Sequence, residues 1–369
     1  MFVPSRLSLA RRRRGFTKVQ LARMTGLTVR SLSAYESTGA GHSDPLPETA
    51  RRLADVLGFP IGFFEAPELR EITAEETTFR ALSKLSAIKR EQALSAGTLA
   101  LDYHRWISER FRLPDLTVPD LAGEHPERAA DILRAEWQLG EKPIPNMVHL
   151  LEVHGVRVFS LAEDYAEVDA FSTWDDGIPF VFLNTLKTAE RGRMDAAHEL
   201  AHLVLHRHGT TVLSRHLEEE AKQFASAFLM PRGGMLPTAP HFPSLDQLIR
   251  VKRKWKVSLA AVVYRLHEIG VITDWHYRSL NIDIARRGYR KTEKNPIERE
   301  TSQIMAKVMA SLRTDGISVV DIARELHLPL NELGAFMAGF TILPVGNGTE
   351  QIEPTATEPP ALTVLRGGR

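Results

Sequence analysis

The chain has 369 residues, of which 43% are hydrophobic and 25% charged, as in ordinary soluble proteins of two or three domains. Its apolar runs are too short to span a membrane, and no apolar segment follows the basic N-terminal residues as a secretory signal requires. It contains no cysteine, which excludes disulfides and thiolate ligands to a metal. These features predict a cytoplasmic protein with no membrane partner.

The charge is unevenly distributed along the chain, although the net charge is only +1. Residues 1–64 contain 10 Lys and Arg against 4 Asp and Glu, a net charge of +6, so the remaining residues carry −5. A basic module joined to a slightly acidic body predicts that an anionic partner binds the N-terminal part.

Residues 5–64 have the periodicity of four or five short helices. One helix begins after Thr17, which forms a capping box with Gln20, and ends at Gly26. The next begins at Thr28. Two helices joined by a short turn that contains glycine are typical of a helix-turn-helix.

The segment TKVQLARMTGLTVRSLSAYE (residues 17–36) resembles the lambda-repressor-like (XRE) family of DNA-binding domains. The resemblance covers about the first sixty residues and implies binding to a double-stranded DNA operator. It places the helix that begins at Thr28 in the major groove and implies phosphate contacts by Lys18, Gln20 and the Arg11–Arg14 cluster. The implied groove residues are Thr28, Val29, Arg30, Ser33 and Ala34. The alternative is a helical bundle that binds protein, and the loop from Ser37 to Pro47 is longer than usual for the family.

Residues 67–142 predict a helical connector, with a long helix from Phe79 towards Phe111 and another at 129–139. From residue 143 the pattern changes to a short helix at 147–153 and then short strands. The predicted strands lie at 156–159, 170–174 and 179–183, with a hairpin turn at Asp175-Asp176-Gly177. A strand edge of this kind can hold an extended polypeptide, and Asn184 at the last strand's end is expected to hold a loop.

The sequence HELAH at residues 198–202 has the highest density of candidate metal-binding and catalytic side chains in the chain. Histidines four apart on a helix lie on one face and can chelate one zinc ion, with Glu199 placed to take a proton from bound water. The alternative is a pair of ordinary histidines on an amphipathic helix.

A hydrolytic zinc site needs a third protein ligand. His206 lies two turns from His198, too far to share one ion on a straight helix. His208 has the metzincin spacing, but that pattern needs a glycine where this chain has Leu205. On the next helix, Glu218 shares a stripe with small apolar residues and is the preferred ligand, with Glu220 second. The alternative for these glutamates is a favourable interaction with the helix dipole.

The segments RGRMDAAHELAHLVLH (191–206) and EEEAKQFASAFLMP (218–231) are similar to the ImmA/IrrE family of metallopeptidases, as are VDAFSTW (168–174) and FLN (182–184). The resemblance runs from about residue 143 to 290. It implies metal binding by His198, His202 and Glu218, with Glu199 as general base. The implied cofactor is Zn²⁺, and these ligands also suit Mn²⁺. Members of this family cleave repressor proteins, and many are encoded with or fused to an XRE module. His208 and His216 are weak candidates for stabilising the oxyanion.

The segment SVVDIARELHLPLNEL (318–333) aligns without gaps on residues 17–32 and predicts a second helix-turn-helix shape. Its second helix carries Asn331 and Glu332 and no basic residue, so packing or partner binding is expected there rather than DNA reading. Two basic groups, at 250–256 and 286–294, are expected to be solvated faces.

Together these patterns predict a mainly α-helical protein with a small β-sheet (α+β), compatible with a homodimer. The predicted parts are an XRE-type domain (1–66), a connector (67–142), a zincin-like metallopeptidase domain (143–290), a C-terminal helical region (291–344) and a flexible tail (345–369). The predicted function is a DNA-binding transcriptional regulator fused to a zinc-dependent endopeptidase that cleaves a repressor or other regulatory protein. The alternative is a regulator or antitoxin-like binding protein whose metal site is sensory or structural.

Overall fold

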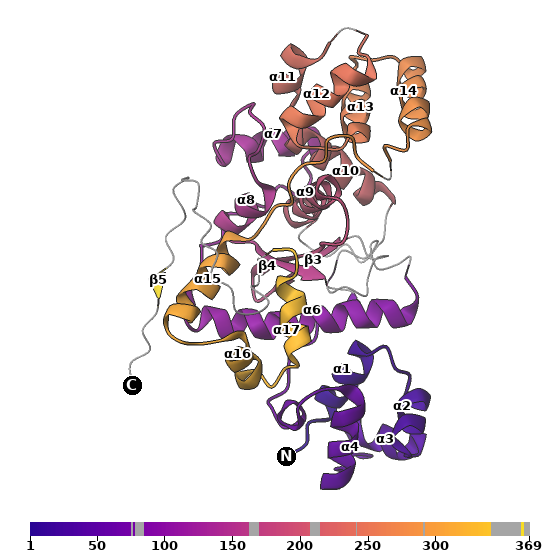
Figure 1. Cartoon of the computed structure of the whole chain (residues 1–369), viewed down its shortest axis with the longest axis vertical. Coiled ribbons are helices and arrows are strands. Elements are labelled where there is room, and N and C mark those ends of the chain that lie inside the picture. Colours follow the sequence, from indigo (N-terminus) through magenta and orange to yellow (C-terminus); the bar gives the residue numbers. More distant parts are fainter. Residues whose placement is uncertain are drawn as a thin grey trace. The chain divides into compact units, whose positions relative to one another are not determined.

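The computed structural model describes residues 1–74, 77, 85–161, 170–206, 215–240, 242–290 and 292–340, and the backbone of 363–364. The chain forms two compact units (Figure 1). The first comprises residues 1–114, 159–168 and 303–369, and the second comprises 115–158 and 169–302. Residues 79–82, His208, and the tail other than 363–364 lie outside the described residues. The long helix predicted to begin at Phe79 begins instead at Ala87, where the Ser86 side chain caps it by accepting a hydrogen bond from the Lys89 N–H.

The N-terminal residues form the predicted helix-turn-helix bundle. Its elements are α1 (Pro4–Arg13), α2 (Lys18–Thr25), α3 (Val29–Tyr35), α4 (Pro47–Leu57) and the 3₁₀-helix η1 (Ile61–Phe64). The Thr17 hydroxyl accepts a hydrogen bond from the Gln20 backbone N–H, and the Gln20 side chain completes the capping box that starts α2. Gly26 ends α2 with φ of 68°, a conformation that glycine adopts without a steric penalty. Thr28 then caps α3.

The core of this bundle is apolar and rich in phenylalanine. Leu21 and Leu32, from the two helices of the motif, are fully buried. Four phenylalanine rings of the same segment pack against one another, namely Phe2, Phe59, Phe63 and Phe64. Such pairs add to the stabilisation from burial alone, so the bundle is closed by aromatic packing after α4.

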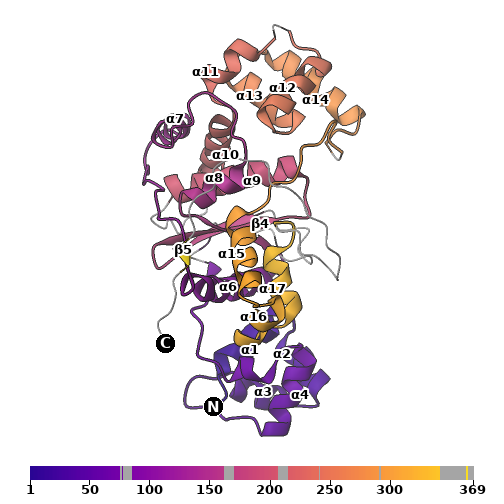
Figure 2. The ribbon, with the colours of Figure 1, turned by 60° about the vertical axis from the view of Figure 1, so that its left-hand side comes forward.

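The long helix α6 (Ala87–Ser108) is the centre of the first unit, where it packs against α1 and α17. Tyr103 on α6 is buried and donates its hydroxyl to the sulfur of Met305. The C-terminal helices α15 (Gln303–Thr314), α16 (Val319–Glu325) and α17 (Leu330–Met337) gather along α6 (Figure 2). The short strands β1 (Phe111–Arg112) and β5 (Thr363–Val364) pair antiparallel. Among the described helices, none combines the length and apolar character needed to cross a bilayer.

The segment that aligns with the N-terminal motif repeats its geometry. Ser318 begins α16 with a capping box to Asp321, as Thr17 does with Gln20 at the start of α2. Leu333 on α17 is fully buried, like the matching Leu32 on α3. The second helix-turn-helix shape is therefore present, within the unit that holds the first.

In the second unit, α7 (Pro126–Glu136) and α8 (Met147–Val153) precede the strands β3 (Ala170–Asp175) and β4 (Ile178–Asn184). The strand β2 (Arg157–Leu161), whose residues fall in the ranges of both units, completes the strand order β2-β4-β3. β3 and β4 pair antiparallel, with Ala170 opposite Leu183. Asp176 and Gly177 form the turn with φ of 47° and 76°, as a two-residue hairpin requires.

The helix α9 (Ala189–Leu205) is the centre of the second unit and packs against β3, β4, α8 and α10 (Arg215–Leu229). The remaining helices are α11 (Arg232–Met235), the 3₁₀-helix η3 (Leu236–Thr238), α12 (Leu245–Trp255), α13 (Leu259–Glu268) and α14 (Asp274–Arg286). α13 contacts α10, α12 and α14 (Figure 1).

The basic group at 250–256 was expected to be a solvated face, and one of its residues, Lys252 on α12, is not solvated. Lys252 is fully buried, and its ammonium donates to Glu190 Oε1 at 2.7 Å. Glu190 belongs to the first turn of α9, so this buried ion pair joins α12 to the central helix. The helix periodicity places Lys252 beside Leu248, on the inner face. Arg250, Arg253, Lys254 and Lys256 are exposed as expected.

Candidate metal centre and nucleic-acid interface

The helix α9 carries the HELAH segment in its last two turns. Thr188 caps the helix by accepting a hydrogen bond from the Arg191 N–H, and no glycine or proline follows before Leu205 except Gly192. Its alanines and leucines are buried on nearly every side, which is typical of a central helix. Packing therefore fixes the backbone from which His198 and His202 project.

The structure brings together the three residues predicted as metal ligands. His198 and His202 lie one turn apart on α9, and Glu218 lies in the first turn of α10. The Nε2 atoms of the two histidines are 3.2 Å apart. Glu218 Oε2 lies 3.5 Å from His198 Nε2, and its Oε1 lies 3.5 Å from His202 Nε2.

These separations suit a single tetrahedral ion. Ligand atoms held about 2.1 Å from one zinc stand roughly 3.4 Å from each other along the edges of a tetrahedron. One donor atom from each of the three residues lies within 4.8 Å of the other two. The Nε2–Nε2 separation of 3.2 Å is close to the tetrahedral edge, and each Nε2 lies 3.5 Å from a different oxygen of Glu218. Two histidines and one glutamate also form a known ligand set of catalytic zinc. The residues present therefore fit a zinc ion.

The electrostatics of this group favour a charged carboxylate beside the two imidazoles. Burial alone raises the pKa of the Glu218 carboxyl, but hydrogen bonds and charges from His198 and His202 outweigh it and lower this pKa. For His198, burial lowers the pKa, whereas Glu218 and Glu199 raise it further than burial lowers it. Positive charge is thus favoured at the point between the three side chains.

Glu199, the predicted general base, is 3% exposed and lies on α9 directly after the first histidine. Its Oε2 accepts a hydrogen bond from Ser172 Oγ at 2.8 Å. Ser172 belongs to β3, and sequence reasoning did not assign it a role. It stands within the VDAFSTW segment quoted for the family resemblance, which is the one signal that could have identified it.

The neighbouring candidates have other contacts. Glu219 is exposed and pairs with Lys222. Glu220, the second choice as ligand, instead accepts from His206 at 3.0 Å. Asn184 holds a turn through a hydrogen bond from the Leu186 N–H, as expected for a loop residue. His216 is 77% exposed and pairs with Glu220.

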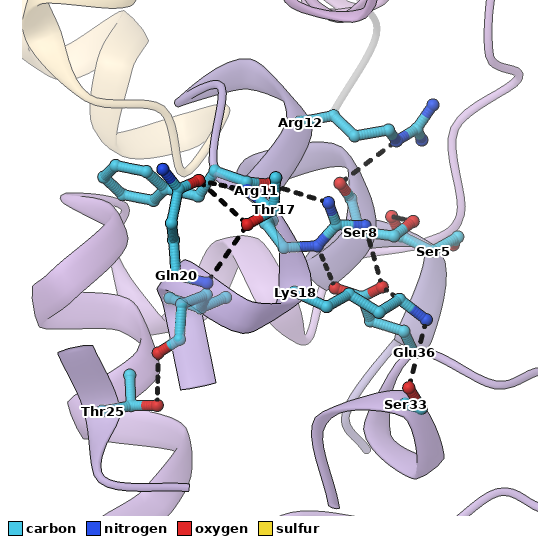
Figure 3. Close-up of polar contacts among 12 residues, drawn as sticks. Ser5, Ser8, Arg11, Arg12, Thr17, Lys18, Gln20, Thr25, Ser33 and Glu36 are labelled. Carbon is cyan, nitrogen blue, oxygen red and sulfur yellow. Dashed lines mark hydrogen bonds and ion pairs between the residues drawn. The ribbon is translucent and has the colours of Figure 1, made fainter. Parts of the chain in front are cut away.

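In the first unit, the predicted groove residues lie on α3 and at its start. Thr28, Val29 and Arg30 are exposed, whereas Ser33 and Ala34 are half-buried. Two of the predicted phosphate contacts, Lys18 and Gln20, lie on α2 (Figure 3). Gln20 is exposed, with its carbonyl oxygen accepting from the Thr17 N–H, and Lys18 Nζ lies 3.4 Å from Glu36 Oε2.

The Arg11–Arg14 cluster corrects the expectation of backbone contacts with DNA. Arg11 forms a two-pronged pair with Glu36, at 2.6 and 3.0 Å (Figure 3). Arg12 pairs with Glu71 and Glu91. Arg13 and Arg14 both pair with Glu332 on α17, and Arg13 is buried. The positive charge of these residues is neutralised inside the unit, through partners that are distant in sequence.

Comparison with known families assigns a class to each of the two sites. Residues 7–64 match a family model described as helix-turn-helix, and residues 151–267 match the Peptidase_M78 model, described as an IrrE N-terminal-like domain. A search of curated proteins finds no match to the chain. The chain thus contains an XRE-type helix-turn-helix domain, a match that supports binding to double-stranded DNA, and an ImmA/IrrE-type metallopeptidase-like domain. Both family resemblances seen in the sequence are confirmed.

Proposed function

We propose that this protein is a transcriptional regulator whose DNA-binding domain is joined to a zinc-dependent endopeptidase that cleaves a repressor or another regulatory protein. The observation that carries the proposal is the grouping of donor atoms from His198, His202 and Glu218 within 4.8 Å of one another, with the buried Glu199 next to His198 on the same helix. A site that only binds metal needs no carboxylate held in place next to its ligands.

Glu199 and Ser172 would have separate roles in the proposed reaction. Glu199 accepts a proton from the attacking water and returns it to the leaving amine, while Ser172 orients its carboxylate. A zinc ion, when bound, lowers the pKa of its water towards 7 and polarises the scissile carbonyl. Three protein ligands leave one coordination position for that water.

The edge of the sheet could bind an extended substrate segment. β3 is an edge strand in the order β2-β4-β3, and it carries Ser172, which contacts Glu199. A substrate segment that adds to this edge through main-chain hydrogen bonds would pass the general base. Binding through the main chain requires an extended stretch of the target protein rather than a compact fold.

The test is a cleavage assay with purified repressor proteins encoded beside the gene, with and without a chelator. Wild-type protein is expected to cut one of them, and the chelator and Glu199→Gln are each expected to abolish cleavage. Co-purification of such a repressor without cleavage, while zinc is bound, would favour the antitoxin-like alternative. Cleavage that persists at the wild-type rate in Glu199→Gln would contradict the proposed base.

For the DNA-binding domain, we propose that Arg30 reads a base and that Lys18 and Gln20 contact phosphates. With duplexes selected from a random library by the wild-type chain, Arg30→Ala is expected to weaken specific binding by about 10- to 100-fold, since one good base contact contributes roughly 1–3 kcal/mol. Arg286→Ala removes the same charge from α14 in the second unit and serves as the control. Equal losses in both variants would assign the effect to net charge.

A further inference from the structure

A second row of polar contacts lies behind the candidate metal ligands. His202 Nδ1, the ring nitrogen that does not face Glu218, lies 2.9 Å from His206 Nδ1. The other ring nitrogen of His206, Nε2, lies 3.0 Å from Glu220 Oε2. Both rings are largely buried, with exposed side-chain fractions of 8% for His202 and 10% for His206.

The order of these contacts determines where the protons lie. If His202 uses the lone pair of Nε2 for a metal, the proton of its neutral ring must be on Nδ1. His202 then donates to His206 Nδ1, which must accept, so the proton of His206 is on Nε2. That proton points to Glu220 Oε2, a carboxylate oxygen that can only accept when ionised. One arrangement of protons satisfies all three residues.

The geometry also separates the roles of two glutamates on one helix. Glu218 is within 3.5 Å of both candidate ligand nitrogens, whereas Glu220 contacts His206 and, through its other oxygen, His216 at 3.2 Å. Glu220 therefore stands one imidazole away from the ligand His202. A carboxylate in this place orients the ligand ring and increases its basicity without binding the ion.

We propose that His206 and Glu220 are positioning residues that fix the tautomer and the ring orientation of His202 for zinc. This inference rests on the proposed function, because it assumes that His202 binds the metal through Nε2. It gives a role to His206, which cannot share an ion with His198 because the two lie two turns apart on the helix.

The test is the zinc affinity of the full chain, measured by competition with a chromogenic chelator. His206→Leu and Glu220→Ala are each expected to weaken zinc binding by about 10- to 100-fold, the usual effect of losing an outer partner of a metal ligand. His206→Gln is expected to recover part of the loss, because its amide oxygen accepts and its amide nitrogen donates. An affinity of His206→Leu equal to wild type would overturn the proposal, and so would an absence of recovery in His206→Gln.

Glu219→Ala is the matched control. It removes the same charge from the adjacent, exposed position of α10, so it is expected to leave the zinc affinity within about twofold of wild type. An equal loss in Glu219→Ala and Glu220→Ala would overturn the proposal in favour of a simple charge effect. Thermal unfolding of each metal-free variant shows that the fold is retained.

The outcomes also separate this inference from the proposed function. A wild-type chain that binds no zinc would contradict both. A wild-type chain that binds zinc and cleaves its substrate, with unchanged affinity in the His206 and Glu220 variants, would overturn the positioning role alone.

Discussion

Ser172 and Glu199 are 27 residues apart in the sequence and meet through one hydrogen bond between a strand and a helix. The hydroxyl donates to one carboxylate oxygen, and both side chains are largely shielded from bulk solvent, since Ser172 is 1% and Glu199 3% exposed. A hydrogen bond to an ionised group in such surroundings is stronger than one in water, and it fixes the rotamer of the acceptor. The orientation of the base is therefore built into the sheet.

Ser172→Ala is expected to lower kcat by about tenfold with little change in KM, because the substrate contacts remain and only the base is less well oriented. Zinc content should stay at the wild-type level, since no ligand is altered. The measurement is steady-state cleavage of the identified substrate, with elemental analysis of the same samples. Loss of zinc from Ser172→Ala would show instead that the serine supports the metal centre.

His154 makes the stability of the second unit depend on pH, independently of the metal centre. Burial against Trp137, whose ring lies 3.8 Å from the imidazole centre, lowers the pKa of His154 from 6.5 to about 4. The unfolded chain therefore binds this proton more readily than the folded one between pH 6.5 and pH 4. The stability that neutral His154 contributes is complete above pH 6.5 and is lost as the pH falls towards 4.

His154→Phe keeps an aromatic ring on Trp137 and cannot titrate. Between pH 6.5 and pH 4, the free energy of unfolding is expected to fall by about 1–3 kcal/mol less in this variant than in wild type. Urea denaturation of the metal-free proteins at both pH values measures the difference. Identical pH dependence in the two proteins would contradict the assigned shift.

At the scale of elements, α17 is joined to α1 by one buried carboxylate. Glu332 is 1% exposed and pairs with Arg13 Nε at 2.7 Å and with Arg14 NH1 at 2.5 Å. Arg14 also donates to the carbonyl of Leu57 at the end of α4. The C-terminal motif thus stabilises the N-terminal bundle, which agrees with the expectation that its second helix packs rather than reads DNA.

Glu332→Ala is expected to destabilise the first unit by about 3–5 kcal/mol, because it removes the carboxylate that pairs with the buried Arg13. Hydrogen exchange should show reduced protection in α1, α4 and α17. Glu109→Ala, which removes an exposed carboxylate paired with Arg110, is the control and is expected to change stability by less than about 1 kcal/mol. Unchanged protection in Glu332→Ala would show that packing alone holds α17.

At the scale of the whole molecule, the sequence could predict those features that depend on near neighbours or on helical periodicity. The Thr17 capping box, the Asp176-Gly177 turn and the two helices of each helix-turn-helix shape belong to this class. The HELAH motif lies within a single helix. The alanine stripe that follows Glu218 on the next helix predicts that this glutamate faces the metal ligands.

Contacts between distant segments could not be predicted in the same way. The Arg11–Arg14 cluster reads as a DNA-binding patch in the sequence, because nothing local shows that Glu332, more than 300 residues away, pairs with two of its arginines. Lys252 likewise looks like a solvated residue in the sequence, because its buried partner Glu190 lies on a different helix. Within the candidate metal centre, the contact of Ser172 with Glu199 likewise joins two segments that are distant in the sequence.

The measurement that tests the central claim most directly is the zinc-to-protein ratio of three proteins: wild type, Glu199→Gln and Glu218→Ala. A ratio near one is expected for the first two, because Glu199 is assigned as a base and not as a ligand. A ratio near zero is expected for Glu218→Ala, which lacks the third ligand. Zinc retained in Glu218→Ala, or lost in Glu199→Gln, would contradict the assignment of these two glutamates and the metalloendopeptidase centre built on it.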